Sequence, residues 1–353
     1  MNYFIIGFYA LLIGGSSLAA FYQKRTIFLL LFSLTLVSFV MGIVGGESAL
    51  WSVTIMAGII AFSAGVSYSF REFLVIILPK ESAKIIRTAP LTAAFGLFII
   101  FTYTITGVFA PVIAPYGESE IISQAFEPAN EKMLLGADQL GRDMFSRIVY
   151  GARNSVGLAL LATLLAFFMG AIGGLLAATK GGKFDQFMSR VIDVVMSIPS
   201  LIFALLLLSI FGTNVVTLII VIAIIYAPRV FRLARSVAGN IVVMDYIEAA
   251  KLRGEGTWYL IRKEVLPNAT APLIAEFGLE FCFVFLLVAG LSSLGLGIQP
   301  PTADWGSMVR ENATLISFGE LTPLIPAGAI ALLTVAVNFV VDWMLYRSSG
   351  LKE

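Results

Sequence analysis

The chain has 353 residues, of which 59% are hydrophobic and only 13% carry a charge. A soluble domain has about 25% charged residues, so a soluble protein could not cover this much apolar surface. The formal net charge of +1 argues against a nucleic-acid-binding protein. The absence of histidine excludes Ser-His-Asp and Cys-His catalytic groups and His-ligated metals. With a single cysteine, Cys282, no internal disulfide can form, and we expect this residue to be a small packing residue. The composition predicts an all-α polytopic membrane protein.

Apolar runs long enough to cross a bilayer recur along the chain. A spanning helix needs about 20 mostly apolar residues. We predict nine spans, at residues 3–21, 27–44, 51–70, 91–113, 155–178, 194–211, 214–228, 273–297 and 323–345. The first run is also compatible with a signal peptide, but the Met-Asn-Tyr before it has no positive charge, so we interpret it as a retained helix. Pro199 is expected to kink its span or to mark the first turn.

The basic residues predict the orientation of these spans. Two hydrophilic stretches interrupt the series of spans, at 114–153 after the fourth span and at 229–272 after the seventh. If 229–272 is cytosolic, alternation places 18 of the 23 basic residues inside and five outside, namely Lys132, Arg142, Arg147, Arg153 and Arg310. This positive-inside bias predicts an N-terminus outside and a C-terminus in the cytoplasm.

The 229–272 loop is the most informative stretch. Residues 241–253 suit a short helix, in which acidic residues precede basic ones as the helix dipole favours. Two alanines there are small enough to let a partner surface approach the backbone, and Gly254 ends the helix. A second amphipathic stretch covers 258–265, and Pro267 precedes the next span. The residues of interest in the short helix are Asp245, Glu248, Ala249, Ala250, Lys251 and Arg253.

Glu248-Ala249-Ala250, followed by Gly254 and then by Leu266-Pro267, resembles the EAA loop of ABC importer permeases. In that family the loop docks into a groove on a cytosolic ATPase subunit. The resemblance implies that the coupling residues of this chain are Glu248, Ala249, Ala250, Lys251, Arg253 and Gly254. Glu264 departs from the family, in which many members have an aliphatic residue at this place.

Two further stretches resemble the C-type permeases of dipeptide, oligopeptide and nickel importers. They are GADQLGRDMFSRIVYGARNSV at 136–156 and LSSLGLGIQPPTADWGSMVRE at 291–311. The first contains a set of polar residues and a glycine on the expected outer side: Asp138, Gly141, Arg142, Asp143 and Arg147. They either contact an extracytoplasmic binding protein or form local salt bridges that fix the loop, and we favour the second. Family members often have an acidic residue shortly before the second stretch, but Val288 stands there, so no role is transferred to it.

The resemblance covers about residues 85–346. It implies the type I ABC importer fold, with six core helices in 81–353. Residues 1–80 then add three helices, which we expect to pack in the lipid; a docking surface for a partner is the alternative.

Ionisable residues inside a membrane usually face a cavity or a partner, because burying them in lipid is costly. Glu276 and Glu280 lie one turn apart on one helix. Glu280 either lines the translocation pathway or lies near the cytosolic interface, which is where we expect Glu276. Asn338, one turn before Asp342 in the last span, is the third pathway candidate, whereas Asp342 itself is expected to be solvated.

No P-loop is present, since Gly182-Lys183 is followed by Phe184 and not by Ser or Thr. We therefore expect no catalytic residue, cofactor or metal in this chain. The resemblance implies a homologous second permease, an extracytoplasmic substrate-binding protein and two cytosolic ATPase subunits that bind ATP and Mg²⁺. The expected function is that of the bacterial inner-membrane subunit forming half of the pathway for di- or oligopeptides, with nickel, opines or oligosaccharides as alternatives. A stand-alone secondary transporter and a non-transporting scaffold are the rival classes; inverted repeats would favour the former, and we find none.

Overall fold

The computed structural model describes residues 7, 10–12, 14–15, 25–318 and 322–348. The chain divides into two compact units, Met1–Arg87 and Thr88–Glu353. Most of the first predicted span, 3–21, lies outside the described residues.

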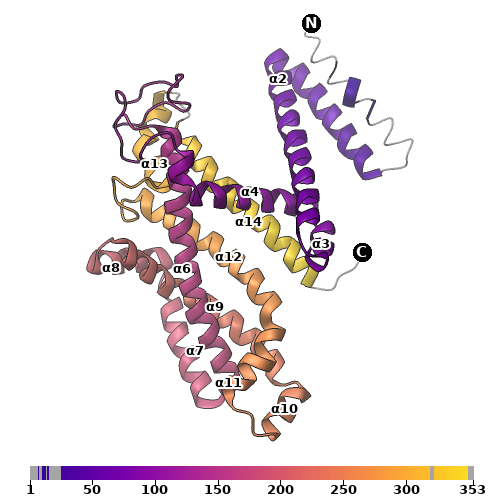
Figure 1. Ribbon diagram of the computed structural model, residues 1–353, viewed down its shortest axis with the longest axis vertical. Coiled ribbons are helices and arrows are strands. Elements are labelled where there is room, and N and C mark those ends of the chain that lie inside the picture. Colours follow the sequence, from indigo (N-terminus) through magenta and orange to yellow (C-terminus); the bar gives the residue numbers. More distant parts are fainter. Residues whose placement is uncertain (1–6, 8–9, 13, 16–24, 319–321, 349–353) are drawn as a thin grey trace. The chain divides into compact units, whose positions relative to one another are not determined.

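The first unit contains α2 (Arg25–Ile77) and α3 (Lys80–Arg87). The spans predicted at 27–44 and 51–70 both fall in α2, whose helical backbone is continuous over 53 residues. A straight helix of that length would measure about 80 Å, far more than the roughly 30 Å of a bilayer core. Accordingly α2 is not straight, and it folds back at a sharp bend (Figure 1).

The second unit is an assembly of long apolar helices joined by short ones. Its elements are α4 (Leu91–Val108), α5 (Ala110–Ile113), α6 (Met144–Lys180), α7 (Gly182–Met196), α8 (Ser200–Phe211), α9 (Val215–Val242), α10 (Asp245–Leu252), α11 (Thr257–Tyr259), the π-helical turn η1 (Leu260–Val265), α12 (Leu266–Ser293), α13 (Trp305–Asn312), the 3₁₀ turn η2 (Ala313–Phe318) and α14 (Leu324–Ser348). Five described segments are long and apolar enough to span a membrane, and the α7–α8 pair makes six when counted as one bent span. The predicted core of six helices is confirmed.

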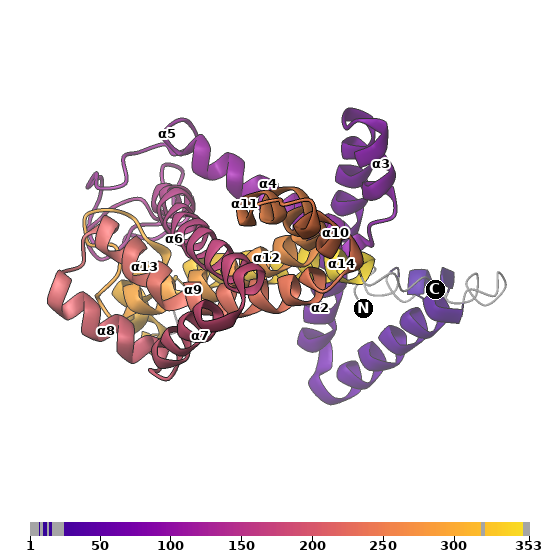
Figure 2. The same cartoon turned by 90° about the horizontal axis from the view of Figure 1, so that it is seen from below.

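The bent pair follows from Pro199. α7 ends at Met196 and α8 begins at Ser200, directly after the proline, and the two axes differ by 86°. Proline lacks the N–H that would continue the helical hydrogen bonds, and it disfavours a helical conformation in the residue before it. The predicted break at Pro199 is confirmed, and Figure 2 shows α8 leaving the direction of α7.

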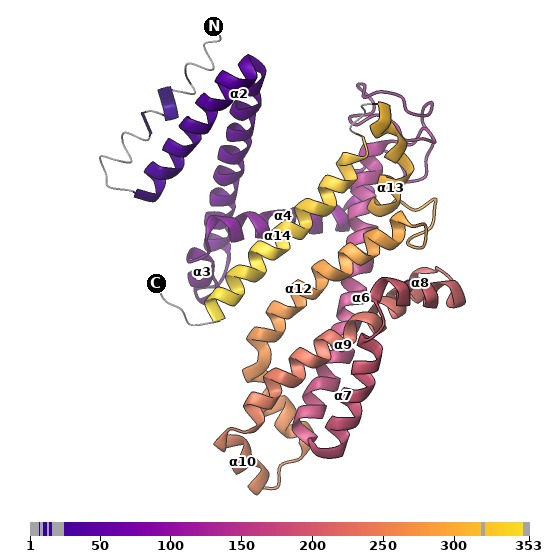
Figure 3. The ribbon, with the colours of Figure 1, turned by 180° about the vertical axis from the view of Figure 1, so that it is seen from behind.

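The closest helix pair in the second unit is α6 with α9, which run side by side (Figure 3). Small residues recur at every fourth position of α6, and a side chain at Gly170 or Gly174 would collide with α9. A Cβ at Gly170 would lie 2.7 Å from Val230 Cβ, and one at Gly174 would lie 2.8 Å from Arg235 N. Small residues let membrane helices approach closely, so this seam positions α9.

Aromatic packing fixes α13 on the ends of the long helices. Trp305 is fully buried, with its ring 5.3 Å from that of Tyr103 in α4 and 6.2 Å from that of Phe285 in α12. Its Nε1 donates to the carbonyl oxygen of Ile148 in α6 at 3.0 Å. Cys282 is buried nearby in the same core, as a packing residue.

The helix boundaries correct the predicted loop at 229–272. α9 continues to Val242 with Pro228 inside it, and helical backbone resumes at Thr257 without a break into α12. Prolines are tolerated within membrane helices when neighbouring helices satisfy the freed backbone groups, so α9 can continue through Pro228. The short helix begins at Asp245, not at residue 241, and the stretch 258–265 belongs to the α12 segment. Arg229 therefore lies in the middle of α9.

Candidate functional site

The short helix α10 protrudes between α9 and α11, at the end of the second unit opposite α13 (Figure 1). We call residues 243–258 the α10 tip. Its helix ends in a Schellman motif, in which Gly254 has φ +83°. Gly254 N donates to Lys251 O at 2.9 Å, and Glu255 N donates to Ala250 O at 3.2 Å. A left-handed residue is required at this position, so the sequence places a glycine there.

One face of α10 packs inward. Ile247 and Ala250 are fully buried in a cluster with residues of α6, α9 and η1: Leu175, Ala238, Leu260, Ile261 and Val265. The expected role of Ala250 therefore needs correction: its small side chain fits this cluster and does not face a partner. The cluster joins the α10 tip to two long membrane helices, α6 and α9.

The other face of α10 is exposed. The remaining predicted coupling residues, Glu248, Ala249, Lys251, Arg253 and Gly254, all lie on the surface. Large apolar side chains of the tip are exposed beside them, with Leu252 at 85% and Trp258 at 65%. Apolar side chains gathered with charges on a protruding surface are typical of a protein–protein contact.

At the opposite end of the unit, the polar residues predicted on the 114–153 stretch form a buried network. Asp138 is at its centre: Arg142 Nε donates to its Oδ2 at 2.7 Å, and Arg147 Nε lies 3.2 Å from the same atom. Both guanidinium groups also reach Glu311 Oε2 in α13, at 3.2 and 3.6 Å. Arg147 Nη1 donates to the carbonyl oxygen of Glu118 at 3.0 Å. The network ties the 114–143 loop to α6 and α13.

Asp143 and Gly141 complete this arrangement. Asp143 caps α6 by accepting hydrogen bonds from Ser146 N at 2.7 Å and from Ser146 Oγ at 2.6 Å. Gly141 has φ +77°, and a side chain there would collide with Ser123 O. Arg142 and Arg147 are only 2% and 1% exposed, and both form local salt bridges, the alternative favoured from the sequence.

Asp304 is a buried polar residue that no predicted motif had singled out. It caps α13 by accepting from Ser307 N at 2.9 Å, and it accepts from Ser155 Oγ of α6 at 2.8 Å. Burial raises the pKa of Asp304 above its usual value, while the hydrogen bonds from Ser307 and Ser155 act in the opposite direction. An aspartate three residues before a serine at a helix start was the available signal.

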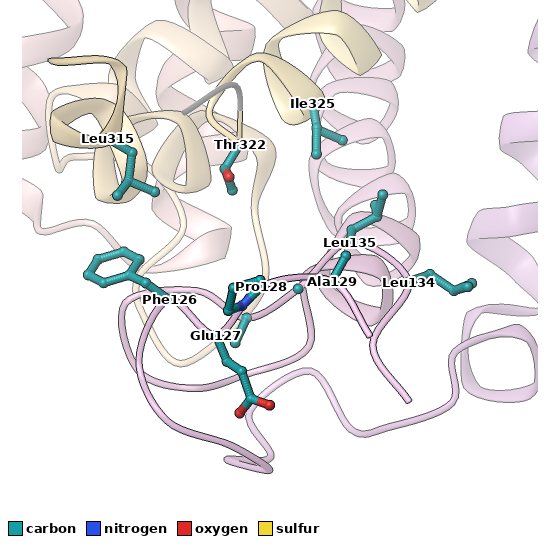
Figure 4. Close-up of a pocket in the computed structure, with 11 residues that line it drawn as sticks. Phe126, Glu127, Pro128, Ala129, Leu134, Leu135, Leu315, Thr322 and Ile325 are labelled. Carbon is teal, nitrogen blue, oxygen red and sulfur yellow. The ribbon is translucent and has the colours of Figure 1, made fainter. Parts of the chain in front are cut away.

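A pocket of about 430 Å³ lies between the 114–143 loop and the start of α14 (Figure 4). Its lining is mainly apolar, with Phe126, Leu135, Leu315 and Ile325 among the contributors, and the Glu127 carboxylate points away from the other labelled side chains. The pocket contains no set of residues suited to catalysis.

The pathway candidates separate into two places. Glu276 and Glu280 lie on the face of α12 towards α9, within electrostatic range of Arg229. Glu280 is 3% exposed and its Oε2 has no hydrogen-bond partner, whereas Glu276 is half-buried. Asn338 is elsewhere, on α14, where Nδ2 donates to Thr334 O at 3.0 Å within the same helix. Arg229 was missed because the predicted span ended at residue 228, which placed it in the following loop.

Comparison with known proteins identifies the family. The model of the family described as "Binding-protein-dependent transport system inner membrane component" matches residues 170–349, just over half of the chain. The chain belongs to this permease family. One relative is the di/tripeptide transport system permease protein DppC of Pseudomonas aeruginosa, 34% identical over 254 residues that cover 70% of this chain and 84% of the relative. The probable D,D-dipeptide transport system permease protein DdpC of Escherichia coli is 31% identical, with 73% and 86% covered.

The chain also aligns with solved transporter structures. A structure of the inward-facing MetNI methionine ABC transporter aligns with a TM-score of 0.48 and 18% identity, over 59% of this permease and 98% of that chain. The permease is a multi-pass inner-membrane protein that works within a transport complex.

Proposed function

We propose that this permease is the transmembrane subunit of an ATP-driven ABC importer and forms half of the translocation pathway for di- and oligopeptides. The peptide class is supported by relatives that are named as di- and tripeptide transport permeases. The observation that carries the proposal is the α10 tip, a capped and exposed helix whose inner face is fixed to α6 and α9. Such a helix can receive a force from outside the membrane and pass it to membrane helices.

In the proposed cycle, two cytosolic ATPase subunits bind ATP and Mg²⁺, and the α10 tip docks on one of them. Closure of the ATPase pair would move the tip, and the Ile247–Ala250 cluster would carry this movement to α6 and α9. A homologous second permease would supply the other half of the pathway. Rigid-body rearrangement of the two halves would then alternate access between the two sides of the membrane.

The proposed orientation places the α10 tip in the cytoplasm, with the N-terminus outside and the C-terminus inside. The 114–143 loop and the pocket beside it would then face the extracytoplasmic binding protein that delivers the peptide. The buried Asp138 network would hold this surface in shape. We assign residues 1–80 a packing role, separate from the six-helix core of 81–353.

The test is uptake of a labelled dipeptide by cells that express the whole importer. Glu248→Ala and Gly254→Pro are expected to abolish ATP-driven uptake while the complex still forms, as measured by co-purification with tagged ATPase subunits. Lys183→Ala, a change at an exposed basic residue of α7 that is not part of the tip, is the matched control. If both tip variants retain uptake, the coupling role of the tip is wrong. Gradient-driven transport by the purified chain alone would instead establish a stand-alone transporter.

A further inference from the structure

Arg229 is held in the membrane part of α9 by aromatic rings. It is the first charged residue of α9, and its guanidinium carbon lies 5.1 Å from the ring centroid of Tyr226 and 5.2 Å from that of Phe283 in α12. Among the described residues, no carboxylate comes within 4.0 Å of it. The ring faces stabilise the cation by cation–π interaction. They leave its planar N–H groups without an anionic partner.

Glu280 is an unpaired acid on the neighbouring helix. Its side chain is buried, Oε2 has no hydrogen-bond partner, and Glu276 adds a second carboxylate one turn away. Arg229 and Glu280 interact electrostatically, yet they do not form an ion pair. A charged group buried in a membrane protein without a partner is costly, so its presence indicates a ligand or a functional contact.

The two opposite charges are held apart by a fixed framework. Tyr226 Oη donates to the backbone carbonyl oxygen of Phe283 at 3.1 Å, which fastens α9 to α12 beside both charges. Phe283, whose ring contacts Arg229, is three residues after Glu280, an axial distance of about 4.5 Å along α12. Phe283 is 50% exposed and Arg229 is half-buried, whereas Glu280 lies beneath them at 3% exposure, so a ligand would meet Arg229 first and Glu280 deeper in the protein.

We propose that Arg229 and Glu280 form a binding site for the charged ends of a zwitterionic peptide. The Arg229 guanidinium would bind the terminal carboxylate through paired hydrogen bonds, and Glu280 would accept the terminal ammonium. A ligand of a single charge would leave one of the two groups unpaired, whereas a zwitterion satisfies both. The ends of an extended dipeptide are about 7 Å apart, so one dipeptide can reach two charged groups that do not contact each other. This inference rests on the proposed peptide transport and names the residues that recognise the peptide.

The test is binding of dipeptides to the assembled importer complex in lipid nanodiscs, without the binding protein. Competition measured by saturation-transfer NMR compares Ala-Ala with N-acetyl-Ala-Ala and with Ala-Ala-amide. The unmodified complex is expected to bind each blocked peptide about tenfold or more weakly, since a charged hydrogen bond is lost. Glu280→Gln should remove the penalty for N-acetylation and keep the penalty for amidation. Arg229→Gln should do the reverse.

Matched controls are Asp342→Asn on α14 and Arg232→Gln on α9, which change exposed charges and should preserve both penalties. Equal binding of all three peptides by the unmodified complex would overturn the inference without recourse to any variant. It would also be overturned if Glu280→Gln and Arg229→Gln kept both penalties. If the binding site is refuted in one of these ways but cells still take up dipeptides normally, the proposed function stands. If cells that express the unmodified importer take up no dipeptide, the proposed function is refuted.

Discussion

Asp185 in α7 and Arg235 in α9 form a bidentate ion pair, in which Arg235 Nε donates to Asp185 Oδ1 and Nη2 donates to Oδ2. The pair joins the first half of the bent α7–α8 span to the part of α9 that leads to the α10 tip. It therefore connects α7 to the segment of α9 that we propose moves with the ATPase.

Asp185→Ala is expected to lower the melting temperature of the purified complex only slightly. The Arg235 side chain is 43% exposed, so solvent screens the pair. Its loss should therefore lower the free energy of unfolding by about 1 kcal/mol or less, in spite of the bidentate geometry. A double-mutant cycle with Arg235→Ala, measured at low and high salt, checks this. A coupling energy that does not change with salt would show that the pair is shielded from solvent.

Replacement of Gly254 is expected to act by straining the backbone and not by a steric clash of the new side chain. No atom lies within 4 Å of the position that a Cβ would occupy, and the φ of +83° is strained for side chains. Gly254→Asn should retain most dipeptide uptake, because asparagine tolerates the left-handed conformation. Gly254→Val should lose it, because β-branched residues do not. Equal activity of the two variants would contradict a role for the Schellman motif.

The sequence was sufficient for the six core spans and the position of α10, because hydropathy and the charge order of Asp245 to Lys251 depend on local residues. It failed at the end of the span predicted at 214–228, because α9 continues to Val242 through Pro228, and neighbouring membrane helices can satisfy the backbone groups that a proline frees. Ala250 shows a second limit. Its size was evident, but whether it faces a partner or the chain's own core depends on contacts with Leu175 and Val265, which are distant in sequence.

Gly170→Ala is expected to destabilise the permease by about 1–3 kcal/mol, because the added methyl group would press on the α9 backbone at Ala227 and on Val230. The matched change Gly239→Ala places a methyl group in open space on α9 and should be neutral or stabilising by up to about 1 kcal/mol. Thermal unfolding in detergent compares the two. Similar melting temperatures for both variants would argue against a close α6–α9 seam.

Asp304 should give the permease a distinctive dependence on pH. Because burial raises its pKa in the folded state, the folded protein binds a proton more readily than the unfolded chain. The contribution of Asp304 to stability therefore rises as the pH falls through its folded pKa towards its usual value, and it is lost as the pH rises. Asp304→Asn should flatten this part of the profile, as seen in the difference between the two melting curves. An unchanged profile would mean that the hydrogen bonds from Ser307 and Ser155 fully offset the burial.

Asp138→Asn should be the most destabilising of these substitutions, at about 3–5 kcal/mol, because it leaves Arg142 and Arg147 buried with only Glu311 to balance them. The amount of complex in the membrane is expected to fall, while dipeptide uptake per assembled complex stays close to normal. Glu131→Gln on the exposed part of the same loop is the control and should change neither quantity. If Asp138→Asn instead preserved the melting temperature and weakened the affinity for the binding protein, the network would be a docking surface. That outcome would require Arg142 and Arg147 to leave their buried positions during the transport cycle, and exposure of both side chains to a water-soluble reagent for arginine would then be expected.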